Sequence, residues 1–141
     1  MMYLLDTSVV SEIRKARAGK ADRHVAAWAA AVPVADLFVS VIAIQELEIG
    51  VLLAERRDPP QGRVLREWLD VHVLHAFEGR VLPVDTQVAR RSAHLHVPSP
   101  RPVRDALMAA TALVHGMTVA TRNVADFEPT GVPVINPWKE A

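Results

Sequence analysis

Four carboxylates stand where a fold of alternating strands and helices would bring its turns together. They are Asp6, Glu46, Asp105 and Asp126. In open α/β sheets, ligands bind in the crevice beyond the carboxyl ends of the strands. Carboxylates that meet there at ~4 Å repel one another by about 4 kcal/mol per pair in an effective dielectric of about 20, unless a cation neutralises them. The pattern therefore predicts a cation site.

The types of donor atom limit which cation can bind and which reaction it can support. Oxygen ligands favour Mg²⁺ or Mn²⁺ over zinc or copper. Such an ion lowers the pKa of a bound water and stabilises charge on phosphate oxygens. The residues thus predict a metal-dependent enzyme that cleaves phosphodiesters or transfers phosphoryl groups. All four carboxylates are expected to bind metal, and Thr7 or Ser8 to orient the bound water.

For two of these carboxylates, another acidic residue of the chain fits the local sequence pattern equally well. Asp6 follows a short apolar run and precedes Thr7, and Asp85 stands in the same setting before Thr86. Aspartate is a preferred helix N-cap, so local sequence does not separate a metal ligand from a cap. Glu46 and Glu48 lie on one predicted helix, and its apolar periodicity favours neither.

The other two carboxylates and the histidines also have simpler explanations. A carboxylate in the first turn of a helix, such as Asp105, is favoured by the helix dipole. Asp126 lies in a segment typical of a turn. Four histidines form two close pairs, His72 with His75 and His94 with His96. Neither pair belongs to a known zinc motif, which favours ordinary surface positions.

Composition limits the class of protein. The chain has 141 residues, half of them hydrophobic, which predicts one domain over residues 1–141. The absence of cysteine excludes thiolate metal sites and fits a cytoplasmic location. No apolar run approaches the ~20 residues of a membrane span. Sixteen basic and 16 acidic residues argue against a dedicated nucleic-acid-binding domain, and only 5% of the residues are aromatic, so RNA contacts would mostly involve the backbone.

Strand and helix patterns alternate along the chain. The predicted strands cover residues 2–5, 37–41, 81–84, 118–121 and 132–135. The predicted helices follow Asp6 and cover residues 22–31, 43–57, 64–77, 86–96 and 103–115. This alternation predicts an α/β fold with a mostly parallel central sheet and helices on both faces. The third strand is expected near an edge, because Pro83 cannot donate to a ladder.

Five segments, taken together, resemble one protein family. They are residues 2–11, 40–50, 105–112, 121–127 and 131–138, in the same order as in the family. The chain resembles PIN-domain ribonucleases, and within them the VapC-like toxins of toxin–antitoxin pairs, in the FitB-like branch. The second segment is similar to the family motif in a way that selects Glu46 over Glu48. The family commonly has Asn where this chain has Ser8.

The resemblance implies a PIN-like domain that acts as a metal-dependent endoribonuclease on RNA, with Mg²⁺ or Mn²⁺ at the acidic residues. It also implies a small VapB-like antitoxin and a homodimer. An antitoxin segment is expected on apolar surface from Val9, Val10, Ile13 and Trp28, with an arginine reaching the carboxylates.

Two rival functions remain. A haloacid-dehalogenase-type phosphatase would need a second Asp at the position of Ser8. A non-catalytic PIN-fold module that binds RNA or protein would gain nothing from four clustered carboxylates.

Overall fold

A five-stranded parallel sheet forms the centre of the computed structural model, which describes residues 1–139. The strands are β1 (Tyr3–Leu5), β2 (Leu37–Ser40), β3 (Val81–Leu82), β4 (Thr118–Ala120) and β5 (Val134–Ile135), in the order β3-β2-β1-β4-β5. Every neighbouring pair is parallel. The carboxyl end of the central strand β1 therefore lies between those of β2 and β4. The predicted α/β class is confirmed, and β3 is an edge strand as expected.

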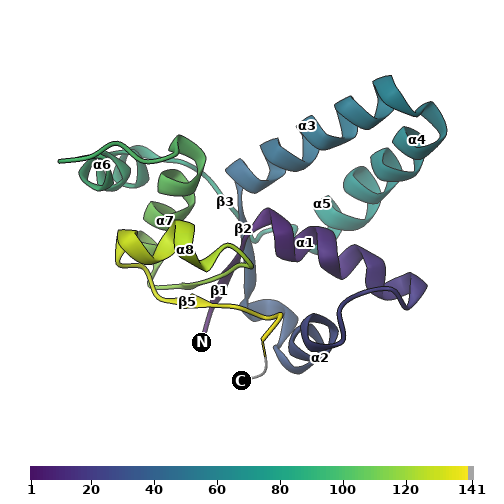
Figure 1. Ribbon diagram of the computed structural model, residues 1–141, viewed down its shortest axis with the longest axis horizontal. Helices are drawn as coiled ribbons and strands as arrows, with labels where there is room; N and C mark the ends of the chain where they lie inside the picture. The colour runs from purple at the N-terminus through teal and green to yellow at the C-terminus, as the bar shows by residue number, and fades with distance from the viewer. Residues whose placement is uncertain (140–141) are drawn as a thin grey trace.

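Helices cover the sheet on both sides. They are α1 (Thr7–Arg14), α2 (Arg23–Ala31), α3 (Val41–Arg57), α4 (Pro59–Glu67), α5 (Leu74–Ala76), α6 (Thr86–Leu95), α7 (Val103–His115) and α8 (Val124–Phe127). Figure 1 shows α6, α7 and α8 on one side of the strands and α1 to α5 on the other. No helix within residues 1–139 is long and apolar enough to cross a membrane. The predicted single domain, residues 1–141, extends two residues past the described part.

Local sequence sets most helix ends. The side chain of Asp85 accepts a hydrogen bond of 2.9 Å from the Val88 amide and caps α6. Helix α7 has the predicted bounds and stops at Gly116, whose φ of 67° lies in the left-handed region that glycine adopts without strain. Four alanines of α7 are fully buried: Ala106, Ala109, Ala110 and Ala112. Their small side chains allow this helix to pack closely in the core.

One predicted helix start is wrong by more than two residues. The helix expected over residues 64–77 begins at Pro59, because prolines fit the first turn of a helix, where the missing N–H has no partner to lose. After Glu67 the chain widens into a π-helix, Trp68–Val73, before α5. Helix α8 was not predicted, since four residues are too few to show a helical period.

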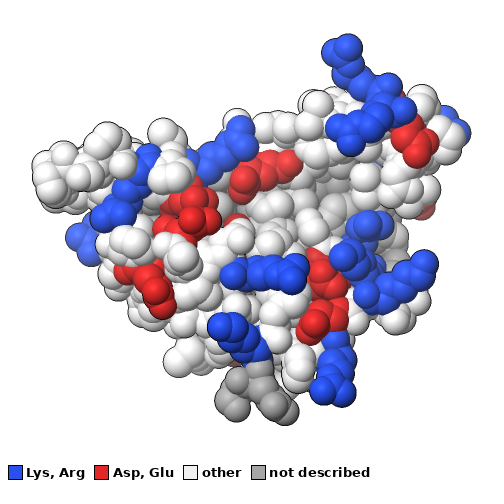
Figure 2. Space-filling model, in the orientation of Figure 1, with Lys and Arg blue, Asp and Glu red and all other residues white. Residues whose placement is uncertain are grey.

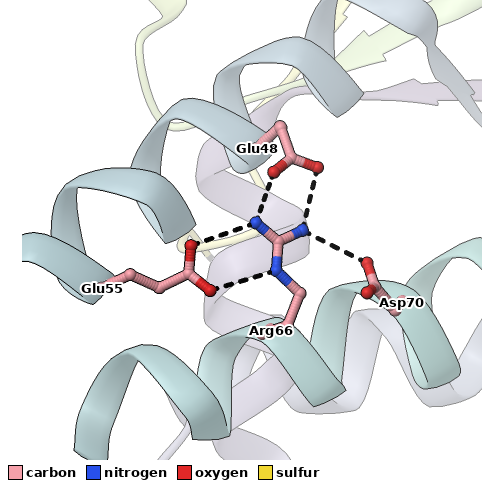
Figure 3. Close-up of polar contacts among 4 residues, drawn as sticks. All are labelled: Glu48, Glu55, Arg66 and Asp70. Atoms are coloured by element: carbon pink, nitrogen blue, oxygen red, sulfur yellow. Dashed lines mark hydrogen bonds and ion pairs between the residues drawn. The ribbon is translucent and has the colours of Figure 1, made fainter. Parts of the chain in front are cut away.

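Helices α3 and α4 form a tightly packed hairpin. A Cβ on Gly62 of α4 would lie 2.5 Å from the Cα of Glu55 in α3, so the two backbones meet there. One turn further along, Arg66 bonds Glu48 at 2.5 and 3.0 Å, Glu55 at 3.3 and 3.4 Å, and Asp70 at 3.4 Å (Figure 3). These contacts hold Glu48 against α4, and the Arg66 guanidinium lowers the pKa of Glu48.

Candidate metal centre

Asp6 lies at the centre of a small hydrogen-bond network at the end of β1. Its Oδ1 accepts from the Thr7 amide at 2.8 Å. Its Oδ2 accepts from Ser8 Oγ at 3.0 Å and from Thr121 Oγ at 2.7 Å. The residue is only 7% exposed. Asp6 is therefore both the N-cap of α1 and a fixed, nearly buried carboxylate that faces the loop after β4, so the two readings of its sequence position are compatible.

Glu46 is joined to the same network through Thr7. The Thr7 hydroxyl donates to Glu46 Oε1 at 2.8 Å, which links α1 to α3. Arg104 of α7 lies 3.8 Å from the other oxygen, Oε2. Glu48, two residues further along α3, is instead bonded to Arg66 of the hairpin. Geometry thus brings Glu46, and not Glu48, to Asp6.

Asp105 is coupled electrostatically to the other three carboxylates. Its pKa is raised to about 6, chiefly because partial burial disfavours the charged form. The charges of Asp126, Asp6 and Glu46 raise it further, in that order of effect. The other three carboxylates therefore all act on Asp105, and we call the four residues the carboxylate cluster.

The members of the carboxylate cluster differ in access to solvent. Asp6 is buried, Glu46 and Asp105 are half-buried, and Asp126 in the first turn of α8 is exposed. In Figure 2, acidic side chains form two neighbouring groups beside a hollow, over the region where Figure 1 places α3, α7 and α8. Basic side chains surround these groups. The cluster is therefore open to a large anionic ligand from one side.

The donor set of the carboxylate cluster fits a hard divalent cation. All donors are carboxylate or hydroxyl oxygens, and within residues 1–139 the one ion pair of a cluster carboxylate joins Glu46 to Arg104 at 3.8 Å. Within residues 1–139, no three His, Cys, Asp or Glu side chains converge closely enough to enclose an ion as they stand. Mg²⁺ usually keeps several waters and binds through one or two carboxylates, so it does not require such a cage. A loose, oxygen-only cluster matches this preference.

Some residues near the cluster were not singled out from the sequence. Thr121 is fully buried, donates to Asp6 and accepts from the Asn123 amide at 2.9 Å. Its position directly after β4 could have marked it, because the ends of β1 and β4 are adjacent in a parallel sheet. Arg104 carried no sequence signal. Asp85 is not among the charges that raise the pKa of Asp105. The role that the structure shows for Asp85 is that of the N-cap of α6.

Ser8 takes a definite place in this network. Its hydroxyl donates to Asp6 and accepts a longer hydrogen bond, 3.4 Å, from the Arg122 amide. It therefore connects the start of α1 to the loop after β4. A serine at this position keeps the polar contact to Asp6 despite its shorter side chain.

A parallel α/β sheet with clustered carboxylates beyond its strand ends defines a class of protein, the α/β folds that bind their ligands at the strand crevice. The model of the PIN domain matches residues 3–128. The chain therefore belongs to the PIN-domain family, as its sequence motifs indicated.

Individual relatives match over nearly the whole chain. The VapC ribonuclease Y4jK of Sinorhizobium fredii is 38% identical, with 99% of this chain and 100% of that protein covered. Toxin FitB of Neisseria gonorrhoeae is 35% identical, with 99% of this chain and 100% of that protein covered. The solved structure of FitAB bound to a DNA fragment superposes with a TM-score of 0.88 at 34% identity, covering 99% and 98%. The resemblance to the VapC-like and FitB-like proteins is confirmed.

Proposed function

We propose that this protein is a metal-dependent endoribonuclease, the toxin of a toxin–antitoxin pair, which uses Mg²⁺ or Mn²⁺ at the carboxylate cluster. The observation that carries the proposal is the placement of Asp6 and Glu46, joined through Thr7, beside Asp105, whose pKa is raised by burial and by the charges of Asp126, Asp6 and Glu46. Relatives named as a VapC ribonuclease and as toxin FitB support the RNA-cleaving and toxin parts. The cytoplasm is the proposed place of action.

The chain's own residues have separable roles in this proposal. A bound divalent ion supplies an activated water and charge stabilisation at phosphate. Asp6, held by three hydrogen bonds, and Glu46, held by Thr7, would hold the ion with fixed oxygens. Asp105 of α7 and the exposed Asp126 of α8 would complete the ligand set. Ser8 and Thr7 keep these oxygens in place, and no side-chain nucleophile is needed.

Metal addition is expected to stabilise the protein and switch on RNA cleavage. The carboxylates repel one another without an ion, so Mn²⁺ or Mg²⁺ binding favours the folded state. At a hundredfold excess of metal over its dissociation constant the gain is about 2.7 kcal/mol. Differential scanning calorimetry with and without Mn²⁺ measures the stabilisation, and cleavage of a defined RNA panel measures activity.

Chelation and a matched cation provide the control. EDTA is expected to abolish cleavage, and Mn²⁺ to restore it, whereas Na⁺ at equal ionic strength restores nothing. Cleavage that persists when pure protein is assayed in EDTA would contradict the metal mechanism. A protein that binds RNA and Mn²⁺ yet never cleaves is the non-catalytic binding module weighed above.

A groove beside α1 is the proposed binding site of the antitoxin. It has a volume of about 400 Å³ between α1 and the segment from α4 to α5, and its apolar lining includes Val10, Ile13, Trp68 and Phe77. The expected surface is wrong at Val9. Val9 is fully buried, and Trp28 packs edge-on against Tyr3, with ring centroids 5.1 Å apart, outside this groove. The FitAB structure, a close superposition, supports a partner of this kind.

Val64→Asp is expected to weaken binding of the proposed antitoxin by at least about tenfold. Val64 lines the groove and is 55% exposed, so a carboxylate there disrupts apolar contact without opening the core. Val34→Asp, at a position 65% exposed and outside the groove, is the matched control. Titration calorimetry compares the affinities, and equal values for both variants would remove the groove from the proposal. Light scattering on the same samples tests the proposed homodimer.

A further inference from the structure

An open pocket lies directly beside the carboxylate cluster, between the loop after β4 and the chain after β5. Its volume is about 790 Å³, within the ~300–1,000 Å³ typical of ligand sites. Its polar lining comes from Arg122, Asn123, Asp126, Asn136, Trp138 and Lys139. Asp126 belongs to the pocket wall and to the cluster. A group bound in the pocket therefore lies next to whatever the cluster holds.

Arg122 and Trp138 are in cation–π contact at the wall of this pocket. The guanidinium carbon of Arg122 lies 5.2 Å from the centroid of the Trp138 ring. Such a cation–π contact holds an otherwise flexible arginine in one orientation. Arg122 is exposed and Trp138 is half-buried. Nucleobases of single-stranded RNA stack on aromatic rings and on arginine planes, so the pair offers a preformed stacking surface.

The amides in the pocket can read the edge of a stacked base. Asn136 Oδ1 accepts from the Trp138 amide at 3.0 Å, which fixes the side chain. Within residues 1–139 the NH₂ group of Asn136 and the side-chain amide of Asn123 have no hydrogen-bond partner in the protein. Such amides supply donors and acceptors that match base edges. Val124 and Val134 add apolar wall beside them.

The charges around the pocket suit a nucleic-acid strand. Arg122 and Lys139 outnumber Asp126, so its lining has a net positive charge. In Figure 2, basic side chains continue from the acidic groups toward the end of the molecule at which Figure 1 marks the C terminus. A phosphate backbone that passes the cluster can therefore continue past the pocket without repulsion.

We propose that this pocket binds a single nucleobase of the RNA strand, next to the scissile phosphate and stacked on the Arg122–Trp138 pair. The proposal rests on the proposed function, because it assumes an RNA strand at the carboxylate cluster. The chain is poor in aromatic residues, so one stacked base is expected rather than an extended platform. The pocket would give the enzyme a preference at one position beside the cut.

Binding of short single-stranded oligoribonucleotides, each with one abasic position, tests the proposal. An Asp105→Asn background prevents cleavage, and fluorescence anisotropy in Mn²⁺ gives the affinities. Loss of one stacked base, worth about 1–3 kcal/mol, corresponds to roughly 5- to 150-fold weaker binding at a single abasic position. In Trp138→Ala and Arg122→Ala this sensitivity is expected to vanish, and in Trp138→Phe to persist.

Arg57→Ala is the matched control, because Arg57 is an exposed arginine at the end of α3, away from this pocket. It is expected to keep the full abasic effect. If Trp138→Ala fails to fold, the exposed Arg122 carries the test alone. Affinities that are insensitive to every abasic position, absence of binding to every oligonucleotide, or an unchanged abasic effect in Arg122→Ala overturn the proposal.

Cleavage assays on the wild-type protein separate this proposal from the proposed function. Position-dependent binding without any cleavage keeps the base pocket and removes the nuclease. Cleavage together with insensitivity to abasic positions keeps the nuclease and removes the base pocket.

Discussion

Asp105→Asn is expected to lower RNA cleavage by at least about a hundredfold while making the metal-free protein more stable. Loss of residues that merely support metal ligands costs about 10- to 100-fold in affinity or activity, so loss of a ligand itself should cost no less. The amide keeps the size of the side chain and its place in the first turn of α7. Cleavage kinetics at saturating Mn²⁺ measure the loss.

The stability gain follows from the raised pKa of Asp105. Its pKa is about 6 in the folded protein, chiefly through burial, against about 3.9 for an unperturbed aspartate. Between these values the folded state binds more protons than the unfolded state, so stability falls as the pH rises through this window. Above pH 6 the whole penalty is present. Asparagine removes it, a gain on the order of 1–2 kcal/mol after allowance for solvent screening of a half-buried group.

Asp85→Asn is the matched control, since it removes a carboxylate by the same substitution. Asp85 caps α6, and asparagine is an equally good N-cap, so stability and activity should both stay near those of the wild type. Urea unfolding of the metal-free proteins at pH 4.5 and pH 7.5 checks the pH dependence. An inactive Asp85→Asn with an active Asp105→Asn would reverse the assignment made from these positions.

Gly62→Ala is expected to destabilise the protein by about 1–3 kcal/mol, the usual cost of overpacking. In an open helix the same change stabilises by about 1 kcal/mol through propensity. At Gly62 the new Cβ would lie 2.5 Å from the Cα and 2.8 Å from the backbone nitrogen of Glu55. Backbone atoms in a helix cannot turn aside, so α3 and α4 must separate. Thermal unfolding should show a lower Tm.

Gly50→Ala is expected to change the stability of the protein in the opposite direction, although Gly50 lies in the same hairpin. A Cβ on Gly50 of α3 would meet nothing within 4 Å, and the residue is exposed. This variant is expected to gain up to about 1 kcal/mol. If Gly62→Ala instead stabilised the protein as Gly50→Ala does, the close approach of the two helices would be wrong. The contact also bears on Glu46, because α3 carries it and the hairpin fixes α3.

Local sequence determined the elements and the family. The alternation of apolar runs and helical periods required a parallel α/β sheet, because each short buried strand is followed by a helix that must return across it. Caps and stops such as Asp85 and Gly116 act over three or four residues, so their effect is visible in the sequence. The prolines at 59 and 60 misled only because a helix end and a helix start look alike there.

Tertiary structure alone decided which acidic side chains meet. Asp6 and Asp85 share the same local setting, yet only Asp6 lies at the central strand, where β4 brings Thr121 to it. Helical periodicity did not choose between Glu46 and Glu48. The packing of α3 against α1 and α4 directs one toward Thr7 and the other toward Arg66. The partners in these contacts are separated along the sequence by 39 positions for Thr7 and Glu46, 115 for Asp6 and Thr121, and 18 for Glu48 and Arg66. Such contacts depend on how the elements pack, and no local sequence pattern encodes them.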